Sequence, residues 1–302
     1  MHRDRDRSLR ILHVTNFNER HDGRLFFNTG RRLNNGFIRL GHSVLEFSDR
    51  DIVKHYKNIH DYSGSKNLNQ KLINTVYNYK PDLLIFGHAD LIKPETLFYL
   101  RDNYKNLRIA QWFLDPLIKD GPDFDKNKSR ILNKINFTDA NFVTTSPDVL
   151  NFLPKNRLNL FMPNPSDSSF EVLNNYENNE CSMDVFFALS HGVHRGILKR
   201  GKYDERADFV NRLVEKTPNV KFDLYGINNI QPIWADSYLK SIANAKMGIN
   251  LSRGSPIKYY SSDRITQLIG NGLLTFIHED TYYNNFFSAD EIVFYNNLSN
   301  LS

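Results

Sequence analysis

Three basic side chains surround a predicted helix start in segment 246–277. Arg253 follows a short apolar strand, Lys258 lies in the loop after it, and Arg264 lies at the start of the helix. In a strand–loop–helix–strand unit, the loop and the helix N-terminus lie at the carboxyl edge of a parallel sheet. The helix dipole and the free backbone amides at that edge favour an anion such as a nucleotide phosphate. The segment therefore predicts a phosphate-binding site that has no Walker or dinucleotide glycine loop.

The polar residues around this helix start are part of the same predicted site. Ser262 and Asp263 precede Arg264 and are placed to cap the helix. Gly192 lies in a second glycine-containing loop, SHGVHRG, which also follows a predicted strand. Two alternatives stay open. Arg264 could be an exposed helix residue paired with a nearby carboxylate, and the loop around Gly192 could be a solvated basic loop.

Length and composition describe a globular protein of two domains. The chain has 302 residues, of which 40% are hydrophobic, and a formal net charge of +5. That length exceeds one ordinary domain. The basic residues are scattered along the chain rather than gathered in one stripe, so we expect no nucleic-acid partner. The single cysteine, Cys181, excludes an intramolecular disulfide, and no apolar run approaches the roughly 20 residues that span a bilayer.

Strands alternate with helical segments along the chain, a pattern typical of parallel α/β sheets with right-handed crossovers. In the first half we predict strands at 11–17, 44–47, 82–86, 108–114, 141–145 and 159–162 and helices at 26–40, 68–79, 95–104 and 129–135. In the second half we predict strands at 183–189, 220–225, 247–251, 273–277 and 291–295 and helices at 204–216, 237–245 and from 263 onward.

The best domain boundary is a polar, turn-rich segment between the two halves. It reads PNPSDSSFEVLNNYENNECS and covers 163–182. Such composition is typical of an exposed linker. We therefore predict a first Rossmann-like domain at 1–165, a linker at 166–182 and a second domain at 183–302, with a cleft between the domains.

Three motifs in this order resemble the glycosyltransferases of the GT-B fold. They are Gly41-His42-Ser43-Val44 after the first helix, the linker from Pro163 to Phe170, and the stretch from Asp263 to Ile277. Within that class, Trp112 to Pro116, Tyr203 to Arg206 and Asn250 to Gly254 look most like the spore-maturation (CgeB-like) group of bacterial transferases. The resemblance covers about positions 10 to 298.

The resemblance implies that the second domain holds a nucleotide sugar and that the first domain holds the acceptor. Arg264 matches an arginine common in the CgeB-like group, and with Arg253, Lys258, Ser262, Asp263 and Gly192 it is expected to contact the donor. Many retaining members carry two glutamates with seven residues between them, and the second binds the ribose hydroxyls. Here that position is Gln267, which can still hydrogen-bond a ribose, and the first falls on Tyr259. The stereochemical outcome is therefore left open.

Acceptor-side chemistry is expected from residues that end strands of the first domain. Inverting transfer needs a base that takes the proton of the acceptor hydroxyl, and histidine or aspartate suits that role. His88 follows a strand directly after Gly87, and Asp115 ends the strand at 108–114, in a position that is acidic in the relatives. We predict His88 and Asp115 as catalytic residues. The alternative for Asp115 is a solvated loop carboxylate, and His13 fits a hydrogen-bonded core histidine.

Other classes of protein give different expectations. A metal-dependent GT-A transferase needs an Asp-x-Asp pair at a strand end. Asp123-Phe124-Asp125 and Asp49-Arg50-Asp51 match the Asp-x-Asp sequence, but we interpret both as chance matches. An oxidoreductase is disfavoured because no GxGxxG follows the first strand. A degenerate GT-B protein that binds a nucleotide sugar or glycan without turnover stays open, because the glutamate pair is missing.

The sequence therefore predicts a metal-independent glycosyltransferase of the α/β GT-B fold, with a nucleotide-sugar co-substrate and no cofactor. Its acceptor is expected to be a glycan or lipid-linked cell-envelope molecule, as in polysaccharide biosynthesis. We expect a cytoplasmic location, with peripheral association at the inner face of the membrane as a further expectation. The last predicted strand ends near Tyr295, so the second domain is also expected to be truncated at its C-terminus.

Overall fold

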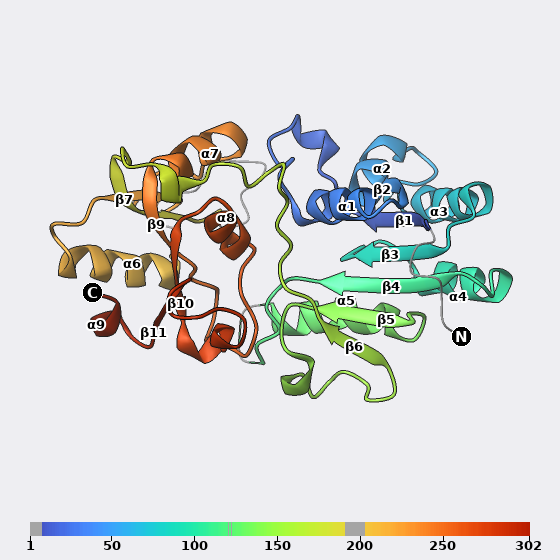
Figure 1. The fold of residues 1–302 in the computed structure, drawn as a ribbon. Helices are drawn as coiled ribbons and strands as arrows, with labels where there is room; N and C mark the ends of the chain where they lie inside the picture. Colours follow the sequence, from blue (N-terminus) through green and yellow to red (C-terminus); the bar gives the residue numbers. More distant parts are fainter. Residues whose placement is uncertain (1–7, 120, 122, 191–202) are drawn as a thin grey trace.

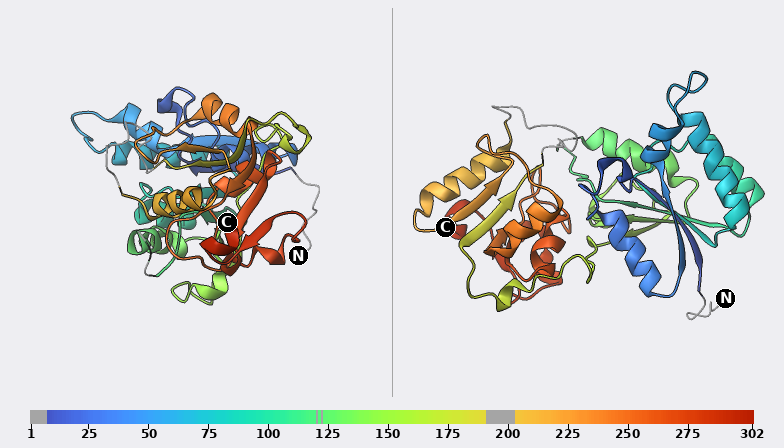
Figure 2. Two further views of the ribbon diagram at one scale, coloured as in Figure 1. Left: turned by 90° about the vertical axis from the view of Figure 1, so that its left-hand side faces the viewer. Right: turned by 90° about the horizontal axis from the view of Figure 1, so that it is seen from above.

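The computed structural model describes residues 8–119, 121, 123–190 and 203–302. In these residues the chain forms two α/β domains, each built on a parallel sheet (Figure 1). The strand order is β2-β1-β3-β4-β5-β6 in the first sheet and β11-β10-β9-β7-β8 in the second. Figure 2 shows the domains as two lobes joined by the linker. This is the predicted architecture of two Rossmann-like domains.

In the first domain, strands and helices largely alternate along the sequence. The strands are β1 (Arg10–Thr15), β2 (Ser43–Ser48), β3 (Leu83–Gly87), β4 (Arg108–Phe113), β5 (Ala140–Val143) and β6 (Leu158–Phe161). The helices are α1 (Thr29–Arg39), α2 (Asp49–Tyr56), α3 (Ser65–Tyr79), α4 (Pro94–Asn103) and α5 (Phe124–Ile135).

Alternating strand residues divide the first core between the two faces of its sheet. Leu12, Val14 and Leu84 pack with buried leucines of α3 and α4 on one face. Ile11 and Ile85 point the other way and pack with partly buried residues of α1. Because neighbouring residues of a strand point to opposite faces, both sides must be covered by helices. The sheet is thus buried on both faces, and its carboxyl edge is left for loops.

The second domain repeats this arrangement. Its strands are β7 (Met183–Ala188), β8 (Phe222–Tyr225), β9 (Ala245–Ile249), β10 (Leu274–His278) and β11 (Val293–Tyr295), and its helices are α6 (Glu205–Lys216), α7 (Ala235–Ala243), α8 (Arg264–Gly270) and α9 (Leu298–Leu301). Phe187 packs toward α6 and α9, whereas its neighbour Phe186 packs toward α7 and α8.

Two elements of the first domain differ from the sequence-based expectation. Helix α2 was not predicted, because β2 runs directly into it at Ser48–Asp49 without any loop residue, and only Ile52 and Val53 supply an apolar face. Helix α5 begins at Phe124, five residues earlier than expected, after Asp123 turns the chain with a left-handed φ of 62°. The Asp123-Phe124-Asp125 segment is therefore a helix start rather than a loop.

Several contacts join the two domains away from the linker. The Lys258 ammonium of the second domain pairs with Asp148 of the first at 2.6 Å, and the backbone N–H of Ser146 donates to the carbonyl of Lys258. Phe161 stacks on Phe286 with ring centroids 5.3 Å apart. These contacts lie on one side of the cleft and hold the two sheets with their carboxyl edges facing each other. Among the described residues, none of the helices has the length and apolar character needed to cross a membrane.

Candidate functional site

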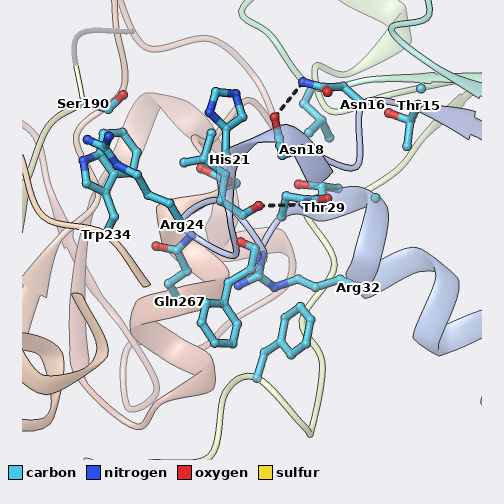
Figure 3. A pocket seen from close by; sticks show the side chains of 18 of the residues that line it. Thr15, Asn16, Asn18, His21, Arg24, Thr29, Arg32, Ser190, Trp234 and Gln267 are labelled. Carbon is cyan, nitrogen blue, oxygen red and sulfur yellow. Dashed lines mark hydrogen bonds between the residues drawn. The ribbon is translucent and has the colours of Figure 1, made fainter. Parts of the chain in front are cut away.

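A cavity of about 1070 Å³ lies between the carboxyl edges of the two sheets. The first domain lines it with residues that follow β1, β2, β3 and β4, and the second domain with residues that follow β7 and with parts of α7 and α8. Both domains thus contribute polar side chains to one space, as Figure 3 shows for ten labelled residues. A cavity of this size and polarity is suited to a bound small molecule.

The loop between β1 and α1 bridges the cavity. Arg24 reaches from this loop to the second domain, where its guanidinium lies 5.1 Å from the ring centroid of Trp234 (Figure 3). At the start of the same loop, the side-chain amide of Asn16 donates to Asn18 at 2.8 Å. At its end, the Asn28 side chain caps α1 by accepting from the backbone N–H of Arg31. The loop is therefore ordered from both ends.

The two predicted catalytic residues lie in the wall of this cavity. His88 and Asp115 follow the neighbouring strands β3 and β4, and the nearest distance from His88 Nε2 to Asp115 Oδ2 is 3.7 Å. Gly87 permits this arrangement, because a Cβ there would lie 2.0 Å from the Trp112 ring. His88 itself has a φ of 55°, a left-handed conformation that is uncommon for histidine.

Burial sets the protonation state of His88. It lowers the pKa of the imidazole, and the nearby Asp115 carboxylate only partly opposes this effect. His88 is therefore neutral near pH 7 and able to accept a proton. The ring also lies against Phe113, with centroids 4.8 Å apart, so packing fixes its orientation.

Arginines surround this pair. Arg130 on α5 contacts Asp115 at 3.4 Å and Asp90 at 3.3 Å, and Arg50 on α2 contacts the same Asp90 at 3.1 Å. Although burial acts to raise it, the pKa of Asp90 stays below its ordinary value because Arg50 and Arg130 stabilise the carboxylate. Asp90 thus pairs with two guanidinium groups, and one of them, Arg130, also pairs with Asp115.

Asp49 and Asp51, which match an Asp-x-Asp string, have different environments. Asp51 accepts hydrogen bonds from Ser48, from the backbone N–H groups of Glu19 and Arg20, and from the Arg20 guanidinium. Asp49 is only 1% exposed, and burial raises the pKa of its carboxyl to about 6. The two side chains do not converge on one point. Among the residues that the structure describes, no group of three or more His, Cys, Asp or Glu could hold a metal ion.

Arg264 lies on the opposite side of the cavity and connects three parts of the second domain. Its guanidinium donates to the carbonyl of Ala188 at the end of β7, to the carbonyl of Leu251 after β9, and to the hydroxyl of Ser262. These bonds use four of the five N–H groups of the side chain. Burial lowers the pKa of Arg264 because none of these partners carries a negative charge. An anion in the cavity would offset that cost.

The other donor-side candidates are divided between the cavity and its surroundings. Asp263 and Gln267 line the cavity with Arg264, and the Gln267 side chain points into it (Figure 3). Arg253, Lys258 and Ser262 are not among the described lining residues. Arg253 contacts Asp123 of the first domain at 3.4 Å, and Lys258 contacts Asp148. Gly192 lies outside the described residues, so the structure says nothing of it.

His13 has the structural role that was its alternative interpretation. It is fully buried, accepts a hydrogen bond from Trp112 Nε1 at 2.9 Å, and makes a second hydrogen bond through Nδ1 to Asn34. Because Nε2 accepts, Nδ1 carries the proton and donates it to the Asn34 oxygen. Burial lowers the pKa of His13 to about 4, so the ring is neutral.

The linker is fixed to the first domain by a buried ion pair at the edge of the cavity. Arg32 on α1 donates to Glu171 through Nε and Nη2, with a shortest distance of 2.5 Å, and both side chains are nearly inaccessible. Arg39 of the same helix pairs with Asp167 at 2.9 Å. These two ion pairs thus fix the linker against α1 where the chain leaves the first domain.

Sequence reasoning missed the arginines of the first-domain wall and Trp234. The available signal was position, since the loop after the first strand of a parallel sheet lies at the ligand-binding edge. Arg20 and Arg24 lie in that loop. Arg130 gave no local signal, because it lies within α5 and reaches the cavity only through the packing of that helix.

Comparisons with known proteins agree with this geometry. Residues 205–302 match a family model described as glycosyl transferase-like. A UDP-forming α,α-trehalose-phosphate synthase from Burkholderia xenovorans has a TM-score of 0.52 and 8% identity, covering 98% of this chain and 89% of that one. A trehalose-6-phosphate structure from E. coli bound with UDP-2-fluoro glucose has a TM-score of 0.50 and 11% identity, covering 95% and 88%. The search of curated proteins found no match.

The two solved structures are 8% and 11% identical to this chain, so they show its fold and not its activity. The family match is a similarity of sequence and lies within the second domain. The chain therefore has the GT-B fold of nucleotide-sugar-using glycosyltransferases, and its segment 205–302 is glycosyl transferase-like.

Proposed function

We propose that the protein is a glycosyltransferase that moves a sugar from a nucleotide sugar to an acceptor hydroxyl in the cleft. The observation that carries this proposal is the cavity between the sheets, which combines a half-buried Arg264, with no ion-pair partner among the described residues, on one side with His88 and Asp115 on the other. The glycosyl transferase-like sequence of 205–302 and the GT-B fold support the same assignment. The E. coli neighbour, which has the same fold, was bound with UDP-2-fluoro glucose.

In this proposal the second domain binds the donor. Arg264 and the N-terminus of α8 face the diphosphate, and Gln267 hydrogen-bonds a ribose hydroxyl. The side-chain amide of Gln267 makes no hydrogen bond with the described residues, so it is available for this contact. Preorganised positive charge stabilises the nucleoside diphosphate as it leaves, without a metal ion.

The first domain binds the acceptor and removes its proton. The acceptor oxygen forms a bond to the anomeric carbon as the bond from that carbon to the diphosphate oxygen breaks, and the His88 imidazole takes the hydroxyl proton. Asp115, next to His88, stabilises the resulting imidazolium. We further propose a cell-envelope glycan or lipid-linked acceptor, a cytoplasmic location with peripheral membrane association, and membership of the CgeB-like group.

The direct test is transfer from a panel of labelled nucleotide sugars by the wild-type protein and by His88→Gln. We expect His88→Gln to lower kcat by about 100-fold or more, because general-base catalysis contributes about 10²–10⁴-fold. Donor affinity should stay unchanged. His55→Gln, at an exposed position on α2, is the matched control and should be fully active. Equal kcat in the wild type and His88→Gln would remove His88 from the reaction.

Metal independence is tested in the same assay. Activity should persist in excess EDTA, and loss that Mn²⁺ or Mg²⁺ restores would favour the metal-dependent class. A protein that binds a nucleotide sugar tightly but neither transfers nor hydrolyses it would support the alternative of a degenerate GT-B binding protein.

A further inference from the structure

A second cavity, of about 730 Å³, adjoins the first on the outer side of the first domain. The two cavities share four lining residues, Arg20, His21, Arg24 and Arg50, so they lie side by side. We call the second cavity the basic groove, because its lining residues are Arg20, His21, Asp22, Arg24, Arg50, Val53, Lys54, Lys57 and Leu91. None of its residues is needed for the donor contacts described above.

One wall of the basic groove is a stripe of cations on α2. Arg50, Lys54 and Lys57 are spaced i, i+4 and i+7, which places them on one face of the helix or directly beyond its end. Lys54 and Lys57 are exposed, and neither makes an ion pair with a described residue. Their charges therefore remain available to a ligand.

The opposite wall comes from the β1–α1 loop and is held in place. Arg20 is fixed by Asp51 and by Asn16, whose side-chain oxygen accepts from Nη1 at 2.9 Å. Arg24 is fixed by its contact with Trp234 and makes no ion pair with a described carboxylate. The two walls thus present arginines held by their contacts and exposed lysines to the same space.

The acidic residues nearby are too few to balance these cations. Asp51 pairs with Arg20, and Asp90 is shared between Arg50 and Arg130. The acidic side chain that lines the groove is Asp22. A concave surface on which charges of one sign predominate concentrates counter-ions and focuses the electrostatic potential. A phosphate, with its several acceptor oxygens and up to two charges, matches a site formed by arginine and lysine donors.

We propose that the basic groove binds a phosphate or diphosphate group of the acceptor, so that the acceptor is a phosphorylated sugar or glycan. Its phosphate lies between α2 and the β1–α1 loop, and its hydroxyl points past the shared residues Arg20 and Arg50 toward His88. This inference rests on the proposed function, since it assumes that the first domain holds the acceptor. It adds the chemical class of that acceptor.

The test measures the binding of glucose 6-phosphate, glucose and inorganic pyrophosphate by isothermal titration. We expect both phosphates to bind and uncharged glucose not to bind. The double variant Lys54→Ala/Lys57→Ala should weaken binding of glucose 6-phosphate by about tenfold, because two charge-assisted contacts are lost. The matched control is Lys66→Ala/Lys93→Ala, which removes two exposed lysines of the same domain that line neither cavity.

Two further arms separate the groove from other anion sites. Arg264→Lys should leave glucose 6-phosphate binding unchanged, because Arg264 lies on the donor side. The lysine double variant should still bind nucleotide sugars. Nucleotide-sugar binding therefore tests the proposed function, whereas the effect of the lysines on phosphate binding tests the groove. Vesicles of phosphatidylcholine with phosphatidylglycerol test whether the lysines instead bind lipid head groups.

The proposal is overturned if glucose 6-phosphate binds no better than glucose, or if the lysine double variant binds both phosphates as the wild type does. It is also overturned if the lysines are needed for binding to vesicles while no soluble phosphate binds, because the groove then contacts a membrane rather than an acceptor.

Discussion

Replacement of Glu171 by glutamine tests the role of charge at the linker most sharply. Glu171 accepts from Arg32 Nε and Nη2, and the two side chains are 4% and 2% exposed. Glu171→Gln keeps the shape of the side chain but leaves the Arg32 guanidinium buried without a counter-charge. Breaking a buried ion pair in this way costs about 3–5 kcal/mol. We therefore expect the free energy of unfolding to fall by about 3 kcal/mol or more.

The assay is urea unfolding followed by circular dichroism, with an exposed ion pair as control. Asp236→Asn removes the same charge from the pair with Lys240, whose side chains are 75% and 77% exposed. That change should leave the free energy of unfolding almost unchanged, because solvent screens an exposed ion pair. Arg32→Met/Glu171→Leu removes both charges and should be more stable than Glu171→Gln. A Glu171→Gln variant as stable as Asp236→Asn, or a double variant less stable than the single one, would refute the reasoning.

Three other predictions concern protonation and donor binding. Asp49→Asn should stabilise the fold by up to about 3 kcal/mol at pH 8, because burial raises the Asp49 pKa to about 6. This gain in the free energy of unfolding should vanish as the pH falls toward 4, and the absence of a gain at pH 8 would contradict the prediction. His13, with its pKa lowered to about 4, should stay neutral at pH 5 in histidine NMR spectra. Because the unfolded chain protonates this histidine more readily than the folded protein does, the free energy of unfolding should fall as the pH drops from about 6.5 to about 4. Gln267→Ala should weaken nucleotide-sugar binding by about fivefold in a titration without changing the unfolding midpoint, and unchanged affinity would exclude the ribose contact.

The proposed catalytic residues, His88 and Asp115, show what the sequence could predict. His88 and Asp115 each follow a strand, and β3 and β4 are neighbours in the sheet. Residues at the carboxyl ends of adjacent parallel strands must lie close together, so position along the chain was enough. Arg264 was placed at the cavity for the same reason. Its hydrogen bonds to two backbone carbonyls were not foreseeable, because they depend on how three loops converge.

Arg253 and Lys258 show what the sequence could not predict. They were expected to face the donor, yet their contacts are Asp123 and Asp148, which lie 130 and 110 residues away in the sequence. A long basic side chain turns toward the nearest carboxylate, and which carboxylate is nearest depends on how the two domains pack. The roles of Arg253 and Lys258 in donor binding stay predictions that mutation can test.

Helix α2 and the basic groove were missed together. Since β2 continues directly into α2, no turn signal separates them, and the cationic stripe at Arg50, Lys54 and Lys57 is recognisable only once that segment is a helix. Pattern reasoning therefore located the carboxyl edge of each sheet but not the basic groove that we propose as the acceptor phosphate site.

The most direct test of the central claim is a structure of the protein with the nucleotide sugar that stabilises it most in a thermal-shift screen, where a ligand at 100 times its Kd adds about 2.7 kcal/mol. The account predicts that the diphosphate lies at the N-terminus of α8 within hydrogen-bond distance of Arg264, and that the sugar points across the cavity toward His88. A diphosphate bound on the first-domain wall instead, or no stabilisation by any nucleotide sugar, would contradict it.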